Sequence, residues 1–388
     1  MQFHLNEEQS LLQESLRRFL DNEYGFEYRQ SIRRTSPQGL RQNWRVFAEN
    51  GWLAVALPES VGGFGGSIVE TLIIAHEFGR VLVIEPYIGC AVLGAQTLLA
   101  SGDKGKIETF LPEVAQGRLR IALAYDEPGL RGLPGPAEMK AKSTVNGYLL
   151  NGKKLLVIGA VDADKFIVST RLEDSGRTGL FLVDADTPDL ERIDLPLHDG
   201  TVAQELVFKD VHISQTAMIG NPDIGLQILR SGYNQGVLAI CASMIGAMER
   251  AIEITSEYLR TRQQFGQPIS SFQVLQHRMA DMATEMELAR SMLFSAMAAV
   301  SSGNTAHADQ SVSFAKSLIG RSAKFVCGQA IQLHGGIGMT EEYVIGHYFK
   351  YAMVANALLG SSSRHDEACA AQLEHQCLED CLDQEQVR

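Results

Sequence analysis

The chain of 388 residues has no excess of positive charge, few cysteines and no long apolar run. It carries 34 Lys and Arg against 46 Asp and Glu, a net charge of −12. That balance disfavours binding to nucleic acid or to anionic membranes. Six cysteines in this length do not make a disulfide framework. The best uncharged stretch, Ser231 to Met248, is too polar and too short to cross a bilayer.

The first ten residues, MQFHLNEEQS, are polar and acidic, whereas a secretion signal would be basic and then apolar. Together with the sparse cysteines, this start predicts a protein of a reducing compartment, which we expect to be cytoplasmic, with no nucleic-acid and no membrane partner. The composition, 45% hydrophobic and 21% charged, is that of an ordinary globular protein. The length suggests two or three domains.

Residues 1–119 have the pattern of a helical domain. Asn6 and Gln9 fit a capping pair before a helix whose apolar residues share one face. Two further helices are expected, at Gly39–Asn50 and Val69–Val83. Between them, Pro58–Gly66 is rich in glycine and must be a loop. Because it lacks the Lys-Ser/Thr ending of a P-loop, a plain turn is favoured over a phosphate cradle.

Residues 120–222 change to short β-type runs punctuated by Gly, Pro, Asp and Asn. The expected strands are Ile121–Tyr125, Tyr148–Asn151, Lys154–Ile158, Lys165–Thr170, Thr178–Val183 and Glu205–Val211. No helix-length pattern lies between them, so an antiparallel sandwich or barrel is expected rather than a parallel sheet. Pro128–Pro136, rich in Pro and Gly, is expected to be a long loop.

Residues 223–388 return to helix. The expected helices are Gly236–Arg262, Ser271–Val300 and Ala306–Leu333. The first is rich in Ala, Gly, Ser and Met, which suits a helix packed closely against its neighbours. The order of helices, strands and a helical bundle predicts an α+β protein of three domains.

Several common catalytic motifs are missing. The sequence has no G-x-G-x-x-G, no H-E-x-x-H and no G-x-S-x-G. Cys377 and Cys381 beside His375 make only half of a metal site, because a zinc site needs about four ligands. A surface helix is therefore favoured there, and we expect no metal.

Two segments have side chains suited to holding phosphate. The first is R-x-Q-F-G-x-P-I-x-x-F-Q, which includes Arg262, Gln264, Phe265, Gly266, Pro268, Ile269, Phe272 and Gln273. The second is Q-L-H-G-G-I-G at Gln332–Gly338. A guanidinium, amide side chains and exposed glycine N–H groups can bind phosphate oxygens. Each segment alone is equally well explained as a helix-connecting turn or a C-cap glycine.

Together these segments resemble the acyl-CoA dehydrogenase family, and the similarity runs over nearly the whole chain. LPESVGGFGG and AHEFGRV resemble its N-terminal helical domain, and AYDEPG at Ala124–Gly129 resembles its flavin-facing T-E-P-G strand. LVFKDVHI at Leu206–Ile213 resembles the end of its β domain. The closing QLHGGIGMTEEYVIGHYFK looks most like the small subunits of heteromeric members, of the pimeloyl-CoA or steroid side-chain dehydrogenase type. The implied fold is an N-terminal helical domain, a central antiparallel β sandwich or barrel and a C-terminal four-helix bundle.

The resemblance also implies a reaction, the α,β-dehydrogenation of an acyl-CoA thioester with FAD. A carboxylate removes the α-proton, the β-hydrogen leaves as hydride to the flavin, and a backbone N–H polarises the thioester. Electron-transfer flavoprotein or a similar acceptor is implied, as is a dimer or tetramer in which each FAD spans two chains. The resemblance places Tyr125, Asp126, Val157 and Ile158 at the flavin ring. It places Arg262, Phe265, Gln273, Gln332, Gly335 and Gly336 at the diphosphate and adenosine of a neighbour's FAD.

The sequence departs from the family at both positions of the catalytic base. Leu359 stands at the usual position, and Asn234, Gln235 and Gly236 stand at the other. Leucine cannot accept a proton and the amides have no useful basicity, and losing a general base typically costs about 10²–10⁴ in rate.

The flavin-facing residues are altered too. Asp126 replaces a threonine that hydrogen-bonds the ring, and Leu156, Val157 and Ile158 replace Trp-Ile-Thr. A carboxylate there would disfavour an anionic reduced ring, unless Asp126 is a loop residue that points at solvent.

These departures leave three hypotheses. In the first, the chain is a supporting subunit that completes the flavin site of a homologous partner. In the second, it is a self-sufficient dehydrogenase whose base is Glu249, Asp126 or Glu127. In the third, it binds acyl-CoA or flavin without catalysis. The sequence does not identify the acyl chain of the substrate. The small residues along Gly236–Gly246 either leave room for a bulky group or allow tight helix packing, and we favour the packing.

Overall fold

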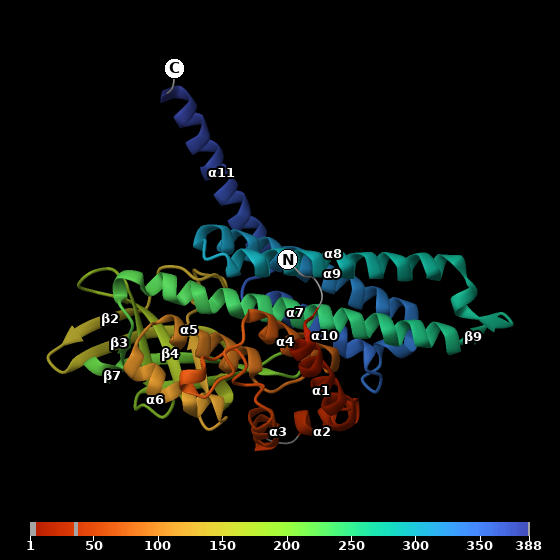
Figure 1. The fold of residues 1–388 in the computed structure, drawn as a ribbon, viewed down its shortest axis with the longest axis horizontal. Coiled ribbons are helices and arrows are strands. Elements are labelled where there is room, and N and C mark those ends of the chain that lie inside the picture. Colours follow the sequence, from red (N-terminus) through yellow and green to blue (C-terminus); the bar gives the residue numbers. More distant parts are fainter. Residues whose placement is uncertain (1–4, 35–37, 387–388) are drawn as a thin grey trace.

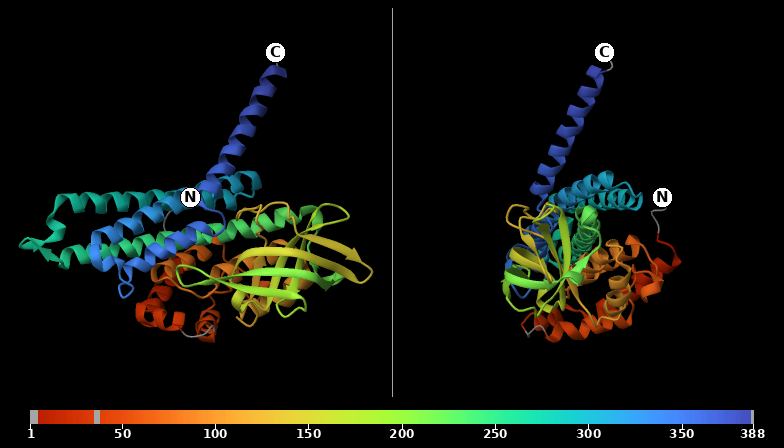
Figure 2. Two further views of the ribbon diagram at one scale, coloured as in Figure 1. Left: turned by 180° about the vertical axis from the view of Figure 1, so that it is seen from behind. Right: turned by 90° about the vertical axis from the view of Figure 1, so that its left-hand side faces the viewer.

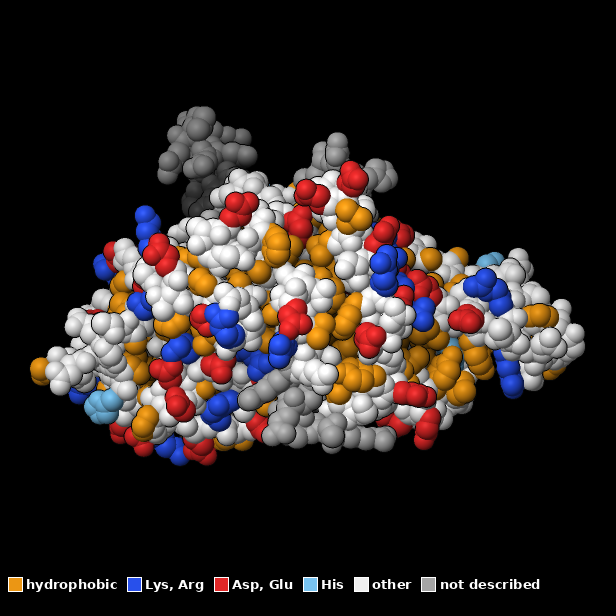
Figure 3. All heavy atoms as spheres, turned by 60° about the horizontal axis from the view of Figure 1, so that its bottom comes forward, with side chains coloured by type: hydrophobic (Ala, Val, Ile, Leu, Met, Phe, Trp, Pro, Cys, Tyr) orange, Lys and Arg blue, Asp and Glu red, His pale blue; other side chains and the backbone are white. Residues whose placement is uncertain are grey.

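The computed structural model describes the backbone of residues 5–34 and 38–386, and the side chains of residues 5–32 and 42–374. The β-sheet lies at one end of the molecule, helices α1 to α4 lie along its middle, and long C-terminal helices run side by side to the other end (Figures 1 and 2). In the described part of the chain, no helix is both long and apolar enough to cross a membrane. On the face shown in Figure 3, acidic, basic and apolar side chains are interspersed.

Six α-helices and one π-helical segment form the N-terminal part of the described chain. The helices are α1 (Glu7–Glu23), α2 (Phe26–Arg34), α3 (Gln38–Glu49), α4 (Ile68–Val81), α5 (Ala95–Ala100) and α6 (Lys104–Ala115), and the π-helical segment is Tyr87–Gly94. The predicted capping pair is confirmed, because Asn6 and Gln9 form a capping box at the start of α1. The sequence pattern did not predict α2, α5, α6 or the π-helical segment.

The glycine-rich loop Pro58–Gly66 is a packing turn. Its backbone N–H groups donate to carbonyls of the same segment and of Ala54–Leu57 just before it. A Cβ on Gly63 would lie 2.1 Å from the Leu57 carbonyl oxygen. Because the N–H groups of its four glycines are all paired in this way, the segment is a packing turn, the interpretation that the sequence favoured.

Eight strands of the described chain form one sheet in the order β6-β7-β3-β2-β4-β5-β8, with β1 paired to β4. Their bounds are β1 Ile121–Ala124, β2 Lys140–Thr144, β3 Gly147–Ile158, β4 Lys165–Leu172, β5 Thr178–Asp184, β6 Leu190–Pro196, β7 Val202–Ser214 and β8 Met218–Ile219. Most pairings are antiparallel, as expected, but β1 and β2 both pair parallel with β4, so the sheet is mixed. The loop Pro128–Pro136 carries the chain along β4 without reversing it, so β1 and β2 run the same way.

Five helices make up the C-terminal part. They are α7 (Gly225–Thr261), α8 (Gln273–Ser301), α9 (Thr305–His334), α10 (Ile345–Ala357) and α11 (Ser362–Gln386), with a hairpin of β9 (Gln263–Gln264) and β10 (Gln267–Pro268) between α7 and α8. Helices α7 to α10 pack together, and α11 packs against α9. Helix α7 begins eleven residues before the expected Gly236.

The backbones of helices α4 and α7 lie in direct contact at two glycines. A Cβ on Gly79 would lie 2.0 Å from the Ser243 carbonyl oxygen, and a Cβ on Gly246 would lie 2.0 Å from the His76 carbonyl oxygen. The small residues of α7 therefore serve tight helix packing, which confirms the favoured interpretation of Gly236–Gly246.

One ion pair is buried beneath the end of β1. The Lys154 ammonium lies 2.5 Å from a carboxylate oxygen of Glu127, and the two side chains are 0% and 2% exposed. Lys154 also donates to the Tyr125 carbonyl and to the Ser169 hydroxyl, while Glu127 accepts from the backbone N–H groups of Glu138 and Met139. This pair ties β1, β3 and β4 to the chain that leads into β2.

We expect Lys154→Met to lower the free energy of unfolding by about 3–5 kcal/mol, because it leaves the Glu127 carboxylate buried without its counter-ion. Chemical denaturation is the measurement. The matched control is Lys209→Met, whose partner Glu191 is exposed, and which should cost about 1 kcal/mol or less. Equal losses of unfolding free energy in the two variants would show that the buried pair stabilises the fold no more than the exposed pair does.

Candidate functional site

A cleft of about 300 Å³ opens where the end of β1, the distorted end of β3 and the turn after α10 meet. We call it the Leu359 cleft. It is lined by Tyr125, Asp126, Glu127, Pro128, Arg131, Gly132, Leu155, Leu156, Ile158, Ala357, Leu358, Leu359, Ser361 and Arg364. The elements that the sequence patterns placed in separate domains thus meet at one site.

A second cavity, of about 230 Å³, adjoins this cleft and shares Ile158 and Leu358 with it. We call it the π-helix cavity, because Tyr87, Ile88 and Gly89 of the π-helical segment form one wall. Helices α7 and α10 form another wall, where the Tyr351 hydroxyl donates to the Ser243 hydroxyl over 2.6 Å. An elongated, mostly apolar ligand could therefore extend from the Leu359 cleft into this cavity.

Asp126 faces the inside of the β1 loop rather than solvent. Its Oδ1 accepts hydrogen bonds from the Gly132 N–H over 2.8 Å and the Glu127 N–H over 2.9 Å, and the residue is 8% exposed. Burial is the main cause that raises the pKa of this carboxyl above its ordinary value. The solvent-pointing alternative is wrong, because the carboxylate fastens the loop.

The neighbouring sequence candidates are held by the same loop. The Tyr125 hydroxyl donates to the Gly132 carbonyl over 2.7 Å. Glu127, one of the three candidate bases, lines the cleft but is locked in the ion pair with Lys154. A carboxylate paired with a buried ammonium is poorly placed to take a proton from carbon.

The distorted end of β3 supplies a cleft residue, Leu156, that the resemblance did not place at the flavin ring. The register of β3 on β7 shifts between Lys154 and Val157, and Leu156 adopts a positive φ of 46°. This bulge leaves Leu156 40% exposed on the cleft wall, whereas Val157 is buried at 2%. Of the two β3 residues expected at the flavin ring, Ile158 lines the cleft and Val157 packs into the core.

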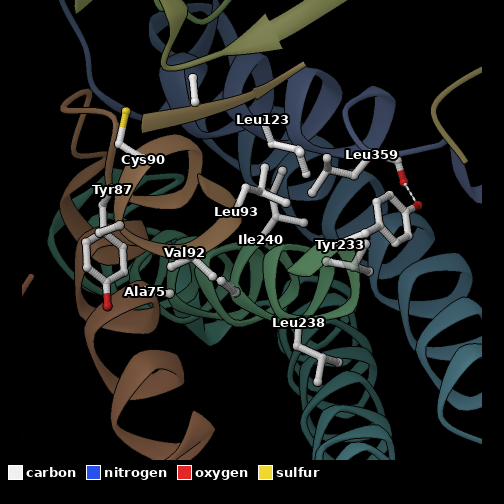
Figure 4. Packing of buried hydrophobic residues seen from close by; sticks show 14 of the residues in the cluster. Ala75, Tyr87, Cys90, Val92, Leu93, Leu123, Tyr233, Leu238, Ile240 and Leu359 are labelled. Carbon is white, nitrogen blue, oxygen red and sulfur yellow. Dashed lines mark hydrogen bonds between the residues drawn. The ribbon is translucent and has the colours of Figure 1, made fainter. Parts of the chain in front are cut away.

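Leu359, at the usual base position, is part of an aliphatic cluster. Figure 4 shows its side chain directed toward Leu93, Leu123 and Ile240, and all four belong to the buried core. Among the described residues, none accepts a hydrogen bond from the Leu359 backbone N–H. The position thus has no proton acceptor, but its amide is free to donate.

The three residues expected at the alternative base position have different surroundings. A Cβ on Gly236 would lie 2.2 Å from a methyl group of Leu93, so the aliphatic cluster fills this space as well. The Asn234 amide donates to Asp309 over 2.7 Å. Gln235 lies beside them on α7 and is half-buried. The structure therefore brings Leu359 and Gly236, from the two expected base positions, together around Leu93.

Glu249 lies outside this site. It lines a different cavity of about 580 Å³ between α1, α4, α7 and α8, together with His76, Arg17 and Arg290. The carboxylate contacts His76 at 3.2 Å and Arg290 at 3.0 Å and pairs with Arg80. Burial acts to raise its pKa, but the hydrogen bond and charge of His76 and the two arginines lower it to about 2. Glu249 is an ion-pair residue and not a base for the Leu359 cleft.

The six residues expected to serve a neighbour's FAD lie at the far end of the C-terminal helices. All six are exposed: Arg262, Phe265, Gln273, Gln332, Gly335 and Gly336. Tyr258 stacks on His334 with ring centroids 4.4 Å apart, which brings the ends of α7 and α9 together. This end lies opposite the sheet in Figure 1. The metal half-site at His375, Cys377 and Cys381 lies outside the described side chains.

The Glu249 cluster gives stability a dependence on acid pH. A Glu carboxyl with an ordinary pKa of 4.5 in the unfolded chain and about 2 in the folded chain stabilises the fold above pH 4.5. That stabilisation, at most about 3 kcal/mol, is lost as the pH falls from 4.5 to 2. We expect Glu249→Gln to be less stable at pH 7 and to show a flatter profile between pH 4.5 and 2. Denaturation at each pH is the measurement, with exposed Glu108→Gln as control; a slope unchanged in Glu249→Gln would refute this assignment.

Comparison with known proteins places this architecture among flavoenzymes. The probable acyl-CoA dehydrogenase YngJ of Bacillus subtilis is 29% identical over 96% of this chain and 100% of its own length. The CarC subunit of the caffeyl-CoA reductase–Etf complex of Acetobacterium woodii is 26% identical over 92% of this chain and 96% of its own. The ChsE4–ChsE5 complex of Mycobacterium tuberculosis contains a chain that superposes with a TM-score of 0.87 at 25% identity, covering 96% of this chain and 99% of that one.

Two family models match the chain. The acyl-CoA dehydrogenase N-terminal domain matches residues 6–118, and the acyl-CoA dehydrogenase C-terminal domain matches residues 223–374. Members of this family are FAD-binding oxidoreductases that act on CH–CH bonds. The order of helices, sheet and helices agrees with their fold. The chain therefore belongs to the acyl-CoA dehydrogenase family.

Proposed function

We propose that the chain is a supporting subunit of an FAD-dependent acyl-CoA dehydrogenase, in which it completes the flavin site of a homologous partner chain. The observation that carries this proposal is the aliphatic cluster. Leu359 stands where we expect a family member to hold its base, and the Leu93 side chain fills the space beside Gly236 of the alternative position. We therefore expect no proton acceptor at the usual base positions, whereas the far end of the chain keeps each residue that the resemblance places at a neighbour's cofactor.

The residues at the two ends fit the two halves of FAD differently. At the Leu359 cleft, the bulged Leu156 and Ile158 offer apolar walls to a ring, but Asp126 presents a carboxylate in place of a hydroxyl. At the far end, the Arg262 guanidinium, the amides of Gln273 and Gln332, and the open backbone of Gly335 and Gly336 suit a diphosphate. FAD bound in the partner would accept the hydride that leaves the acyl group.

The length of α7 supports sharing between chains. At about 1.5 Å per residue, the stretch from Tyr233 beside the Leu359 turn to Arg262 spans roughly 40 Å. A dinucleotide with its ring in the Leu359 cleft cannot also reach Arg262 of the same chain. Arg262 and its neighbours must then serve a second chain, which we propose is a homologue that carries the base.

We further propose that the chain is the small subunit of a heteromeric family member, as in pimeloyl-CoA or steroid side-chain dehydrogenases. The structural similarity to a chain of the ChsE4–ChsE5 complex supports this proposal. Electron-transfer flavoprotein is the acceptor that we propose, and the likeness to a subunit of an Etf complex supports it.

We expect Arg262→Ala in this chain to lower the FAD content of the co-purified complex at least about tenfold, since it removes a charge-assisted contact to the diphosphate. Leu359→Met in this chain is the matched control and should leave FAD content and turnover unchanged. The measurement is flavin absorbance per complex after gel filtration. Full activity of this chain purified without a partner, or FAD content unaffected by Arg262→Ala, would refute the supporting role.

One observation favours a second candidate, a self-sufficient dehydrogenase that uses Asp126 as base. Asp126 lines the Leu359 cleft, its pKa is raised by burial, and among the described residues its Oδ2 has no hydrogen-bond partner.

The substitution Asp126→Asn separates the candidates. Asn keeps the Oδ1 that accepts from Gly132 and Glu127, so the supporting-subunit proposal expects turnover of the complex to stay within about threefold. A loss of about 10² or more would assign Asp126 the role of general base. Acyl-CoA-dependent turnover by stopped-flow flavin absorbance is the measurement.

A further inference from the structure

The cavity lined by Glu249, which we call the Glu249 cavity, lies apart from the Leu359 cleft. Helices α1, α4, α7 and α8 enclose its volume of about 580 Å³. Among the described residues, it shares no lining residue with the Leu359 cleft or with the π-helix cavity. None of the residues that the resemblance places at FAD lines it either. The cavity is therefore a candidate site for a ligand of its own.

Most of the wall of the Glu249 cavity is apolar. Helices α4, α7 and α8 contribute eight apolar side chains, five of them in the buried core: Val69, Leu72, Ile73, Ala242, Ile245, Leu293, Phe294 and Met297. Leu5, just before the start of α1, also lines the cavity and is 38% exposed, so this side opens to solvent. A concave site lined mainly by such side chains takes the apolar part of a ligand.

The opposite part of the wall is charged, and its carboxylate has no acceptor site left. Glu249 pairs with Arg80 and lies 3.2 Å from His76, 3.0 Å from Arg290 and 3.5 Å from Arg17. An ionised carboxylate offers about four acceptor sites. Donors from α1, α4 and α8 therefore occupy Glu249 completely, and a further donor in this cavity has to find its acceptor elsewhere.

The two arginines that line the cavity have unused donors. Arg17 Nε donates to Glu77 over 2.8 Å, and Arg290 Nη2 also lies 3.8 Å from Glu287. Within the described chain, Nη1 of Arg17 and both Nε and Nη1 of Arg290 donate to no acceptor. The two side chains are 40% and 34% exposed, so a ligand can reach them. A guanidinium with free N–H groups binds a carboxylate, often through two parallel hydrogen bonds.

The spacing along α8 sets the length of the ligand. Arg290, Leu293, Phe294 and Met297 all line the cavity and follow one face of the helix. From Arg290 to Met297 the helix rises about 10 Å. An extended alkyl chain with C–C bonds of about 1.5 Å covers this distance with roughly eight carbons. The wall thus suits an anion with a medium-length apolar chain.

We propose that the Glu249 cavity binds a straight-chain monocarboxylate of about eight carbons. Its carboxylate lies on the free donors of the two arginines, and its chain lies along Leu293, Phe294 and Met297. The proposal goes beyond the proposed function and does not depend on it, because no residue of the Leu359 cleft or of the far end takes part.

The test uses the full chain purified without a partner, and octanoate as the probe. Calorimetry would compare octanoate with 1-octanol and octylamine, which have the same chain but no negative charge. We expect octanoate to bind at least about tenfold tighter than either, which is the value of a charge-assisted hydrogen bond. Octanoate should also bind tighter than butanoate, which leaves the apolar wall empty, and tighter than dodecanoate, which is too long.

Two variants locate the ligand. Arg290→Gln removes the free donors on α8 and should weaken octanoate binding about tenfold. The matched control is Arg278→Gln, also on α8, whose exposed guanidinium donates to Gln329 outside the cavity; it should leave binding unchanged. Met297→Ala keeps both arginines and enlarges the apolar end, so it should shift the preferred chain from octanoate to dodecanoate. If Arg290→Gln does not fold, Met297→Ala still decides.

Four results would overturn the proposal. One is a wild type that binds octanoate no tighter than 1-octanol. Another is an octanoate affinity that Arg290→Gln changes by less than about twofold. A third is a chain-length preference that Met297→Ala leaves unaltered. The last is displacement of octanoate by octanoyl-CoA, which would put the carboxylate in the Leu359 cleft. None of these bears on the FAD content of the complex, so failure here is distinguishable from failure of the supporting role.

Discussion

Helix α7 imposes the constraint on which the rest of the site depends. It runs for 37 residues, which at about 1.5 Å per residue is roughly 55 Å. Its first half lies against the Leu359 turn through Tyr233, and its end presents Arg262 to solvent at the opposite end of the molecule. The close approach of Gly79 and Gly246 to backbone carbonyls fixes α7 against α4, so the two ends cannot move toward each other. Any ligand that needs both kinds of residue must therefore lie between two chains.

This separation makes the two ends chemically independent. In the proposed assembly, a side chain in the Leu359 cleft acts on a ligand of its own chain, whereas Arg262 and the Gln332–Gly336 turn act on a ligand of a neighbour. In that assembly, a leucine in place of a carboxylate at position 359 removes chemistry from one site and leaves the other untouched. The aliphatic cluster of Leu93, Leu123, Ile240 and Leu359 shows how such a loss is stabilised, because four apolar side chains bury one another where a carboxylate would need solvation or a partner.

The sequence predicted the fold well because its signals are local or carried by family motifs. The Asn6–Gln9 capping pair, the loop Pro58–Gly66 and the long C-terminal helices follow from patterns a few residues long. The parallel pairing of β1 and β2 with β4 could not be read, because it depends on where the loop Pro128–Pro136 carries the chain. The roles of Lys316, Leu156 and Glu249 depend on neighbours distant in sequence. Lys316 meets the α10 end about forty residues later, and the acidic residue Glu249 acquires its depressed pKa from α4 and α8.

The turn around Leu359 is held by a buried polar group, the Lys316 ammonium, where an apolar side chain would suffice for packing. Replacing buried charged or polar groups by well-packed apolar residues is often neutral or stabilising. A buried ammonium on three carbonyls is therefore not the most stable way to fill this space. Its distinctive property is directional, since three donors fix three carbonyl oxygens at set positions. Direction matters at this turn because φ of Leu359 is positive and its N–H is unpaired within the described chain.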